Sequence, residues 1–98
     1  MPVPMAILVL VLAHFFDWAS FMVMIGRHGL GAEGNPLVVH VATVWGVPGL
    51  TIVKIAAVVL SATVFAVLLP KSRKLAMLVL TFGVLAGAFG TLSNVISI

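Results

Sequence analysis

Three long apolar runs separated by short polar segments dominate the chain. The first run, residues 4–25, is interrupted only by His14, Asp17 and Ser20. A helix of about 22 residues is about 33 Å long, enough to cross a hydrocarbon core of about 30 Å. Two further runs of similar length follow. The sequence therefore predicts an all-α integral membrane protein, one domain over residues 1–98, with transmembrane helices at 4–25, 50–69 and 75–96.

A fourth apolar stretch, residues 36–45, is too short to span a bilayer. Asn35 and Pro36 before it are typical of a helix N-cap and a first helical position. The segment Gly46-Val47-Pro48-Gly49 ends it. We predict a short helix over 36–45, either an interfacial helix anchored by Trp45 or a kinked lead-in to the next span, and prefer the separate interfacial helix.

The composition agrees with a membrane location. The 98 residues are 63% hydrophobic and 7% charged, with a mean hydropathy of +1.37, which leaves too little polar surface for a water-soluble domain of this size. The net charge of +3 comes from scattered cations, so we exclude nucleic acid as a partner. Because the chain has no cysteine, a disulfide framework and a cysteine zinc site are excluded.

The loop Lys71-Ser72-Arg73-Lys74 carries three cations in four residues. The positive-inside rule therefore predicts a cytoplasmic loop, a cytoplasmic N-terminus and an external C-terminus. The first five residues carry no charged side chain, unlike the basic start of a signal peptide. We therefore expect Met1 to be retained.

Two ionisable residues, Asp17 and Lys54, lie inside predicted spans. Isolated charges in hydrocarbon are costly, so both are candidate functional residues. Counting along antiparallel helices puts Asp17 about 4 Å and Lys54 about 7 Å outside the bilayer centre, at about 1.5 Å per residue. The matched depth predicts an ion pair, which is either a device that fixes folding and register or part of a transport or proton-relay site.

Further polar residues surround this pair in the sequence. His14 precedes Asp17 by one helical turn, and Ser20 follows it by one turn. His14 is either a proton relay beside a carboxylate or a histidine hydrogen-bonded across a helix interface. With two polar residues of the third span, the predicted intramembrane polar site in the outer half comprises His14, Asp17, Lys54, Thr91 and Asn94.

The sequence shows no pattern for a cofactor, a metal ion or catalysis. Haem ligation by His14 and His40 is rejected, because His40 lies on the short helix near the outer surface and no spacing motif supports it. The serines lack a patterned base and acid, and there is neither an HExxH motif nor a glycine-rich phosphate loop. We therefore expect no enzyme activity.

The third span contains closely spaced glycines. Gly83 and Gly87 form the small-xxx-small pattern that lets two helix backbones approach, and Gly90 follows. This glycine seam is either a homo-oligomer contact or a packing surface within one protomer, against Ala57 and Ser61 of the second span.

The motifs together resemble those of a widespread family of small prokaryotic membrane proteins without an assigned activity. The similarity covers Asp17 to about Ser61 and consists of an intramembrane Asp, a Glu-x-Asn-Pro tetrapeptide and a following intramembrane Lys. The third span matches no motif of the family. Compact membrane proteins of this kind also occur in phages, so a phage origin stays open. The resemblance marks Asp17, Glu33, Asn35, Pro36 and Lys54.

Two classes of function follow from this pattern. In the first, which we prefer, the protein is a helical interaction or assembly subunit that contacts lipid and either other copies of itself or other membrane proteins. Its contact surface would include Trp18, Trp45 and the glycine seam. In the second, it is an oligomeric ion or proton channel or transporter that uses the polar layer around Asp17 and Lys54.

The predicted orientation can be tested by cysteine labelling. Because the chain has no cysteine, the variants S72C and S97C each carry one reactive thiol. An impermeant maleimide applied to intact cells should label S97C alone, since the cationic loop is cytoplasmic. Labelling of S72C and not of S97C would reverse the orientation.

Overall fold

The computed structural model describes residues 2–29, 31, 33 and 35–98 of the chain. These residues form three helices, α1 (Val3–His28), α2 (Pro36–Leu68) and α3 (Arg73–Ser97). Each is long and apolar enough to cross a membrane, which confirms the all-α fold and the three helices of spanning length. The expectation for Met1, and part of the predicted loop before Asn35, lie outside the described residues.

Helix α1 ends where its sequence stops favouring a helix. Gly29 adopts φ 74°, a backbone conformation that glycine accepts without steric cost, and its N–H donates to the carbonyl of Ile25 at 2.8 Å. Arg27 and His28 in the last turn place positive charge at the negative end of the helix dipole. These contacts extend the helix three residues beyond the apolar run.

Helix α2 starts as predicted and leaves helical geometry within the predicted interruption at residues 46–49. The Asn35 side chain accepts from the N–H of Leu37 at 3.0 Å, and Pro36 follows as the first helical residue. A separate helix over 36–45 is not seen. Residues 36–68 form one element that leaves helical geometry at Gly46, with φ 76° and ψ 174°. Pro48 reinforces this kink because it has no N–H to donate to an earlier carbonyl.

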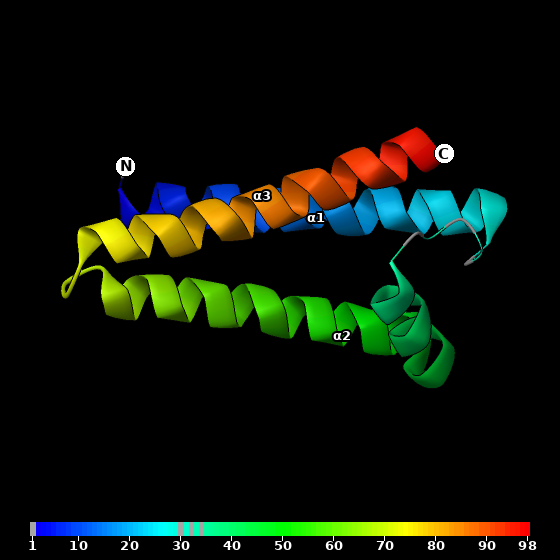
Figure 1. Cartoon of the computed structure of the whole chain (residues 1–98), viewed down its shortest axis with the longest axis horizontal. Helices are drawn as coiled ribbons and strands as arrows, with labels where there is room; N and C mark the ends of the chain where they lie inside the picture. The colour runs from blue at the N-terminus through cyan, green and yellow to red at the C-terminus, as the bar shows by residue number, and fades with distance from the viewer. Residues whose placement is uncertain (1, 30, 32, 34) are drawn as a thin grey trace.

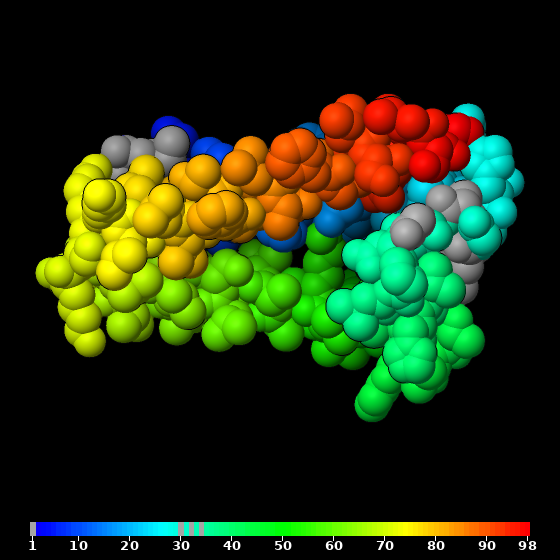
Figure 2. Space-filling model, in the orientation of Figure 1, coloured from blue at the N-terminus to red at the C-terminus, as the bar shows by residue number. Residues whose placement is uncertain are grey.

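The kink sets an arm, residues 36–45, at a steep angle to the rest of α2 (Figure 1). The arm projects from the bundle at the end opposite the N-terminus (Figure 2). Of the two sequence interpretations, the kinked lead-in therefore describes the backbone.

The three helices run up, down and up within a body of 44 × 25 × 19 Å, so that α1 and α3 are parallel and α2 is antiparallel to both (Figure 1). A tight turn joins α2 to α3, and the Ser72 hydroxyl accepts from the N–H of Leu75 at 3.3 Å as the N-cap of α3. The loop cations Lys71, Arg73 and Lys74 are exposed at the end that also holds the N-terminus.

The closest helix contact is between α1 and α3, and glycines permit it. A Cβ atom built at Gly87 would lie 2.8 Å from the carbonyl carbon of Ala13, and one built at Gly83 would lie 2.9 Å from Cδ1 of Leu10. From Gly83 to Gly87 along α3, the contact on α1 moves from Leu10 to Ala13, as expected for two helices that run in the same direction. Any side chain at Gly87 would therefore push the two backbones apart.

The glycine seam therefore packs within the protomer, and mainly against α1. A Cβ at Gly90 would lie 2.6 Å from Cγ of Asp17, whereas Ser61 of α2 makes only ordinary contact with the Gly83 position at 3.9 Å. Ala57 is exposed. The expectation that Ala57 and Ser61 face the seam is thus wrong for Ala57, and the seam is not available to a second copy.

The half of the bundle next to the α2–α3 turn is filled by an apolar core. Its buried members are Ala6, Leu10, Phe65, Ala76 and Leu80. Most other large apolar side chains point outwards, as expected for a protein whose surroundings are lipid rather than water.

The fold predicts that G87A destabilises the protein and G26A does not. The added methyl group in G87A meets the Ala13 backbone and should lower the free energy of unfolding by about 1–3 kcal/mol. At Gly26 nothing lies within 4 Å of the new atom, and the better helix propensity should be neutral or stabilising. Unfolding in mixed micelles, followed by circular dichroism, measures both. Equal stability of the two variants would contradict the close α1–α3 contact.

Candidate functional site

Asp17 of α1 and Lys54 of α2 form the ion pair expected from their matched depth, with Nζ of Lys54 donating to Oδ2 of Asp17. The side chains are only 22% (Lys54) and 20% (Asp17) exposed. Pairing avoids an isolated charge in a low-dielectric layer. The attraction between the two charges offsets the free energy of desolvating them only when further hydrogen bonds satisfy their remaining donors and acceptors. His14 and Asn94 supply those bonds.

His14 connects this pair to α3. Its Nε2 lies 2.8 Å from the carbonyl oxygen of Gly83, and its Nδ1 lies 3.1 Å from Nζ of Lys54. A carbonyl can only accept and an ammonium group can only donate, so these contacts require a neutral imidazole with its hydrogen on Nε2. This geometry corresponds to the histidine hydrogen-bonded across a helix interface.

Asn94 of α3 also hydrogen-bonds to Asp17. The amide is only 4% exposed, and its Nδ2 lies 3.0 Å from the backbone oxygen of Asp17, 3.1 Å from Oδ1 of Asp17 and 3.1 Å from Oγ of Ser20. The Ser20 hydroxyl can therefore accept from Asn94 while it donates to the carbonyl of Phe16 at 2.7 Å. These hydrogen bonds from Asn94 connect α3 to α1 at the depth of the ion pair.

These contacts define a polar cluster to which all three helices contribute. Every buried side-chain nitrogen and oxygen among the residues that the structure describes has a hydrogen-bond partner. Thr91 is the predicted member that is not brought in, since its hydroxyl donates to the carbonyl of Gly87 on its own helix at 2.9 Å. The members of the polar cluster are His14, Asp17, Ser20, Lys54 and Asn94.

A cavity of about 370 Å³, the vestibule, reaches the cluster from the end that holds the arm. Asp17 and Lys54 line it together with Glu33, Asn35 and Asn94. A carboxylate oxygen of Glu33 accepts from the N–H of Asn35 at 3.0 Å. The hydrogen bond from Asn35 to Glu33 therefore fixes the backbone just before α2, next to the ion pair, and Pro36 follows as the first residue of the helix.

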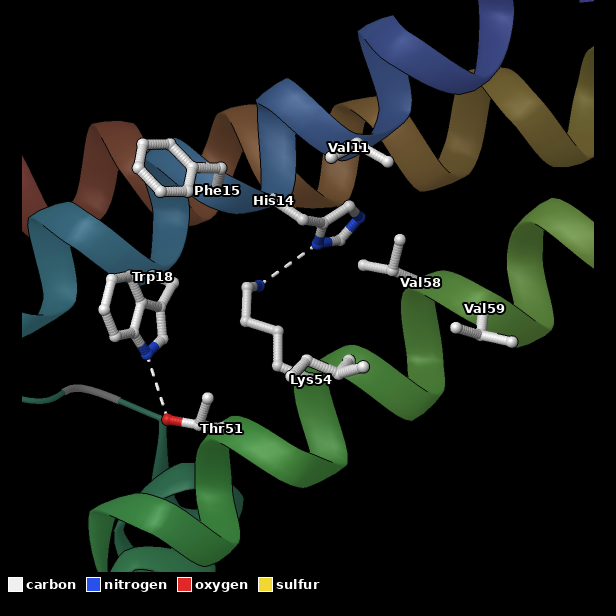
Figure 3. A pocket seen from close by; sticks show the side chains of 9 residues that line it. Val11, His14, Phe15, Trp18, Thr51, Lys54, Val58 and Val59 are labelled. Atoms are coloured by element: carbon white, nitrogen blue, oxygen red, sulfur yellow. Dashed lines mark hydrogen bonds between the residues drawn. The ribbon is translucent and has the colours of Figure 1, made fainter. Parts of the chain in front are cut away.

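A second cavity, the groove, lies between α1 and α2 and has a volume of about 380 Å³. Trp18 closes one end of it by donating from Nε1 to Oγ1 of Thr51 at 3.0 Å, as Figure 3 shows. Sequence reasoning missed this bond, although Trp18 lies one turn after His14 and Thr51 one turn before Lys54. The walls are mostly apolar, and the lining includes Val11, His14, Phe15, Lys54, Ile55, Val58 and Val59.

The geometry offers little to a metal ion or a haem. The part of the chain that the structure describes contains no group of three or more His, Cys, Asp or Glu side chains placed to hold a metal ion. Both ring nitrogens of His14 are engaged in the cluster, whereas His40 is exposed on the arm. His14 therefore has no ring nitrogen left for an iron atom.

Comparisons with known proteins found no relatives. No family model matches the chain, and neither a curated protein nor a solved structure is significantly similar to it. The resemblance seen in the motifs between Asp17 and Ser61 therefore stays a prediction.

The cluster predicts strong coupling between Asp17 and Lys54. D17A leaves a cation in the hydrocarbon layer with only His14 beside it, and it should lower the free energy of unfolding by about 3–5 kcal/mol. The double variant D17A/K54M removes both charges and should recover part of this loss. A double-mutant cycle measured by unfolding in mixed micelles tests the pair. A double variant no more stable than the worse single variant would show that the two charges are not coupled.

Proposed function

We propose that the protein is a small helical assembly subunit of a prokaryotic plasma membrane that associates with a second copy of itself through α3. The observation that carries this proposal is a continuous row of large apolar side chains on the exposed face of α3. Their spacing alternates between three and four residues over 22 residues. We call this row the α3 seam, and its members are Leu75, Leu78, Phe82, Leu85, Phe89, Leu92 and Ile96.

The spacing of the seam suits helix pairing. An average repeat of 3.5 residues keeps one face turned towards a partner helix, as in the a and d positions of a coiled coil. Phe82 and Phe89 lie one heptad apart, and the exposed small residues Ala86 and Ser93 follow each of them at the same offset. Large and small side chains can then interlock, which matters because packing rather than hydrophobicity drives association in lipid.

The partner is a second copy because the seam is complementary to itself. Two copies inserted with the same orientation bring their α3 helices together in parallel, related by a twofold axis, so that the same face of each copy forms the contact. The seam side chains are exposed, and one side of α3 is uncovered in Figure 2.

The polar cluster supports a structural role for the interior. Its ion pair is neutral overall, and its hydrogen bonds link α1 to both α2 and α3. Such a cluster fixes the register of the helices and presents the α3 seam on a rigid body.

We also propose that the N-terminus is cytoplasmic. The exposed Lys71, Arg73 and Lys74 lie at that end of the bundle, which favours the cytoplasmic side. The arm would then lie at the external surface, where Trp45, 72% exposed, fits the aromatic belt of the membrane interface.

Ion or proton transport is the second candidate, and the vestibule is the observation that favours it. Water entering from the arm side would reach the Asp17–Lys54 pair. The opposite half, however, is filled by Leu10, Phe65, Leu80 and their neighbours in the apolar core. Transport would require this core to open, whereas assembly requires no such change.

Self-association predicts that F82A/F89A weakens a dimer. Copies labelled at S97C with donor and acceptor dyes should show energy transfer in liposomes, because the seams pair in parallel. Truncating both rings should raise the dissociation constant about tenfold, equivalent to about 1.4 kcal/mol of lost packing. The matched control V53A/L60A removes two exposed apolar side chains, also seven residues apart, from α2 and should leave the transfer unchanged.

Two outcomes would contradict the assembly proposal. The first is a wild-type protein that stays monomeric at high protein-to-lipid ratios. The second is an equal loss of energy transfer in both double variants, which would show that association does not depend on the α3 seam.

The assembly proposal also predicts that liposomes containing the wild-type protein hold a pH gradient, because the apolar core blocks one half of the bundle. A pH-sensitive dye inside the liposomes measures the leak, and D17N serves as the comparison. A proton leak in the wild type that D17N abolishes would favour the transport candidate instead.

A further inference from the structure

The groove between α1 and α2 lies outside the proposed dimer contact, since the residues that line it come from α1 and α2. Its volume of about 380 Å³ falls within the range of small-molecule sites, which is roughly 300–1,000 Å³. Such sites are mostly apolar with a few placed polar groups. The groove has this character, with His14 and Lys54 projecting into it from the two helices (Figure 3).

Lys54, which lines both the groove and the vestibule, has one N–H without a partner among the described residues. The Lys54 ammonium group has three N–H bonds, of which one is directed to Asp17 and one to His14. The N–H of Trp18 is used by Thr51, whose hydroxyl donates in turn to the carbonyl of Val47 at 3.0 Å. Within the described part of the chain, the third N–H of Lys54 is therefore the donor left for a ligand.

Charge balance decides which acceptor fits. Asp17 already neutralises Lys54, so a carboxylate or phosphate ligand would add an uncompensated negative charge to the hydrocarbon layer. A neutral carbonyl oxygen accepts from the remaining N–H without that cost. The head of the ligand is therefore a neutral acceptor.

The depth of the donor excludes ordinary phospholipid heads. Counted along the spans at about 1.5 Å per residue, Asp17 lies about 4 Å and Lys54 about 7 Å from the bilayer centre. Ester carbonyls of phospholipids stay near the interface, about 15 Å from the bilayer centre. A ligand that reaches Lys54 must therefore be soluble in hydrocarbon as a whole.

The walls favour a planar head and a chain. Phe15 and Trp18 have ring centroids 6.2 Å apart and stand at one end of the groove, as Figure 3 shows. Aromatic faces pack well against another flat ring. Val11, Val58 and Val59 line the other end and provide an apolar track.

We infer that the groove binds a membrane quinone, with a ring carbonyl accepting from Lys54, the ring beside Phe15 and Trp18, and the tail along Val58 and Val59. A quinone combines a neutral acceptor, a planar ring and an apolar chain in one molecule that dissolves in the bilayer interior. The inference concerns binding, and it goes beyond self-association through α3.

Fluorescence of Trp18 tests this inference. The chain has two tryptophans, so the W45F variant in phosphatidylcholine nanodiscs reports on Trp18 alone. Decylubiquinone added to it should quench the fluorescence with saturation. V58F fills the groove and should weaken this binding at least about tenfold, and V59F on the same wall should do the same. The matched control V53F adds the same ring at an exposed α2 position that does not line the groove and should leave binding unchanged.

Competition identifies the head group without any groove variant. Decylbenzene has the chain and a ring but no carbonyl, so it should compete about tenfold less well than the quinone. Oleate should compete no better than decylbenzene, because its carboxylate is excluded. Quenching that rises without saturation, or is the same in V58F, V59F and V53F, would overturn the site. Equal competition by decylbenzene or oleate would overturn the quinone as its ligand.

Discussion

The Asp17–Lys54 ion pair is the interaction on which the other features of this small protein depend. Neither charge is tolerated alone in hydrocarbon, so α1 and α2 must lie at matched depths. Each partner then needs further hydrogen bonds, which His14 and Asn94 supply from the two remaining directions. A single electrostatic requirement therefore fixes the register of all three helices.

The contrast between two kinds of helix contact explains where the cavities lie. Gly87 brings α1 and α3 to backbone contact, whereas α2 is held to α1 by the long side chain of Lys54, which keeps the two backbones apart at this depth. The groove and the vestibule flank this spacer on its two sides. In the other half of the bundle, Phe65 fills the space and no spacer is needed.

The sequence predicts much of this arrangement because bilayer thickness converts residue number into depth. The three spans and the partner of Asp17 follow from that conversion, whereas the N-cap at Asn35 follows from the Asn-Pro pair. Periodicity, in contrast, shows that glycines share one face of α3 but not which helix lies opposite. Thr91 has the right depth, yet a threonine hydroxyl in a helix readily bonds its own backbone instead.

The kink and the tryptophan contact show a second limit. Glycine and proline at positions 46 and 48 predict an interruption, but one dihedral angle at Gly46 decides the direction of the arm. The bond between Trp18 and Thr51 depends on two side-chain rotamers on different helices. The local sequence therefore predicts where α2 is interrupted and at which depth a residue lies. The direction of the arm and the rotamers of Trp18 and Thr51 depend on tertiary packing.

The parallel contact of α1 with α3 has a consequence for biosynthesis. Of the three helices, α1 leaves the ribosome first, yet its tightest partner is α3, which leaves after α2. During translation α1 and α2 can pair their charges as a hairpin, but the glycine face that completes the packing arrives last. Until then the backbone of Ala13 must be covered by lipid or by an insertion factor.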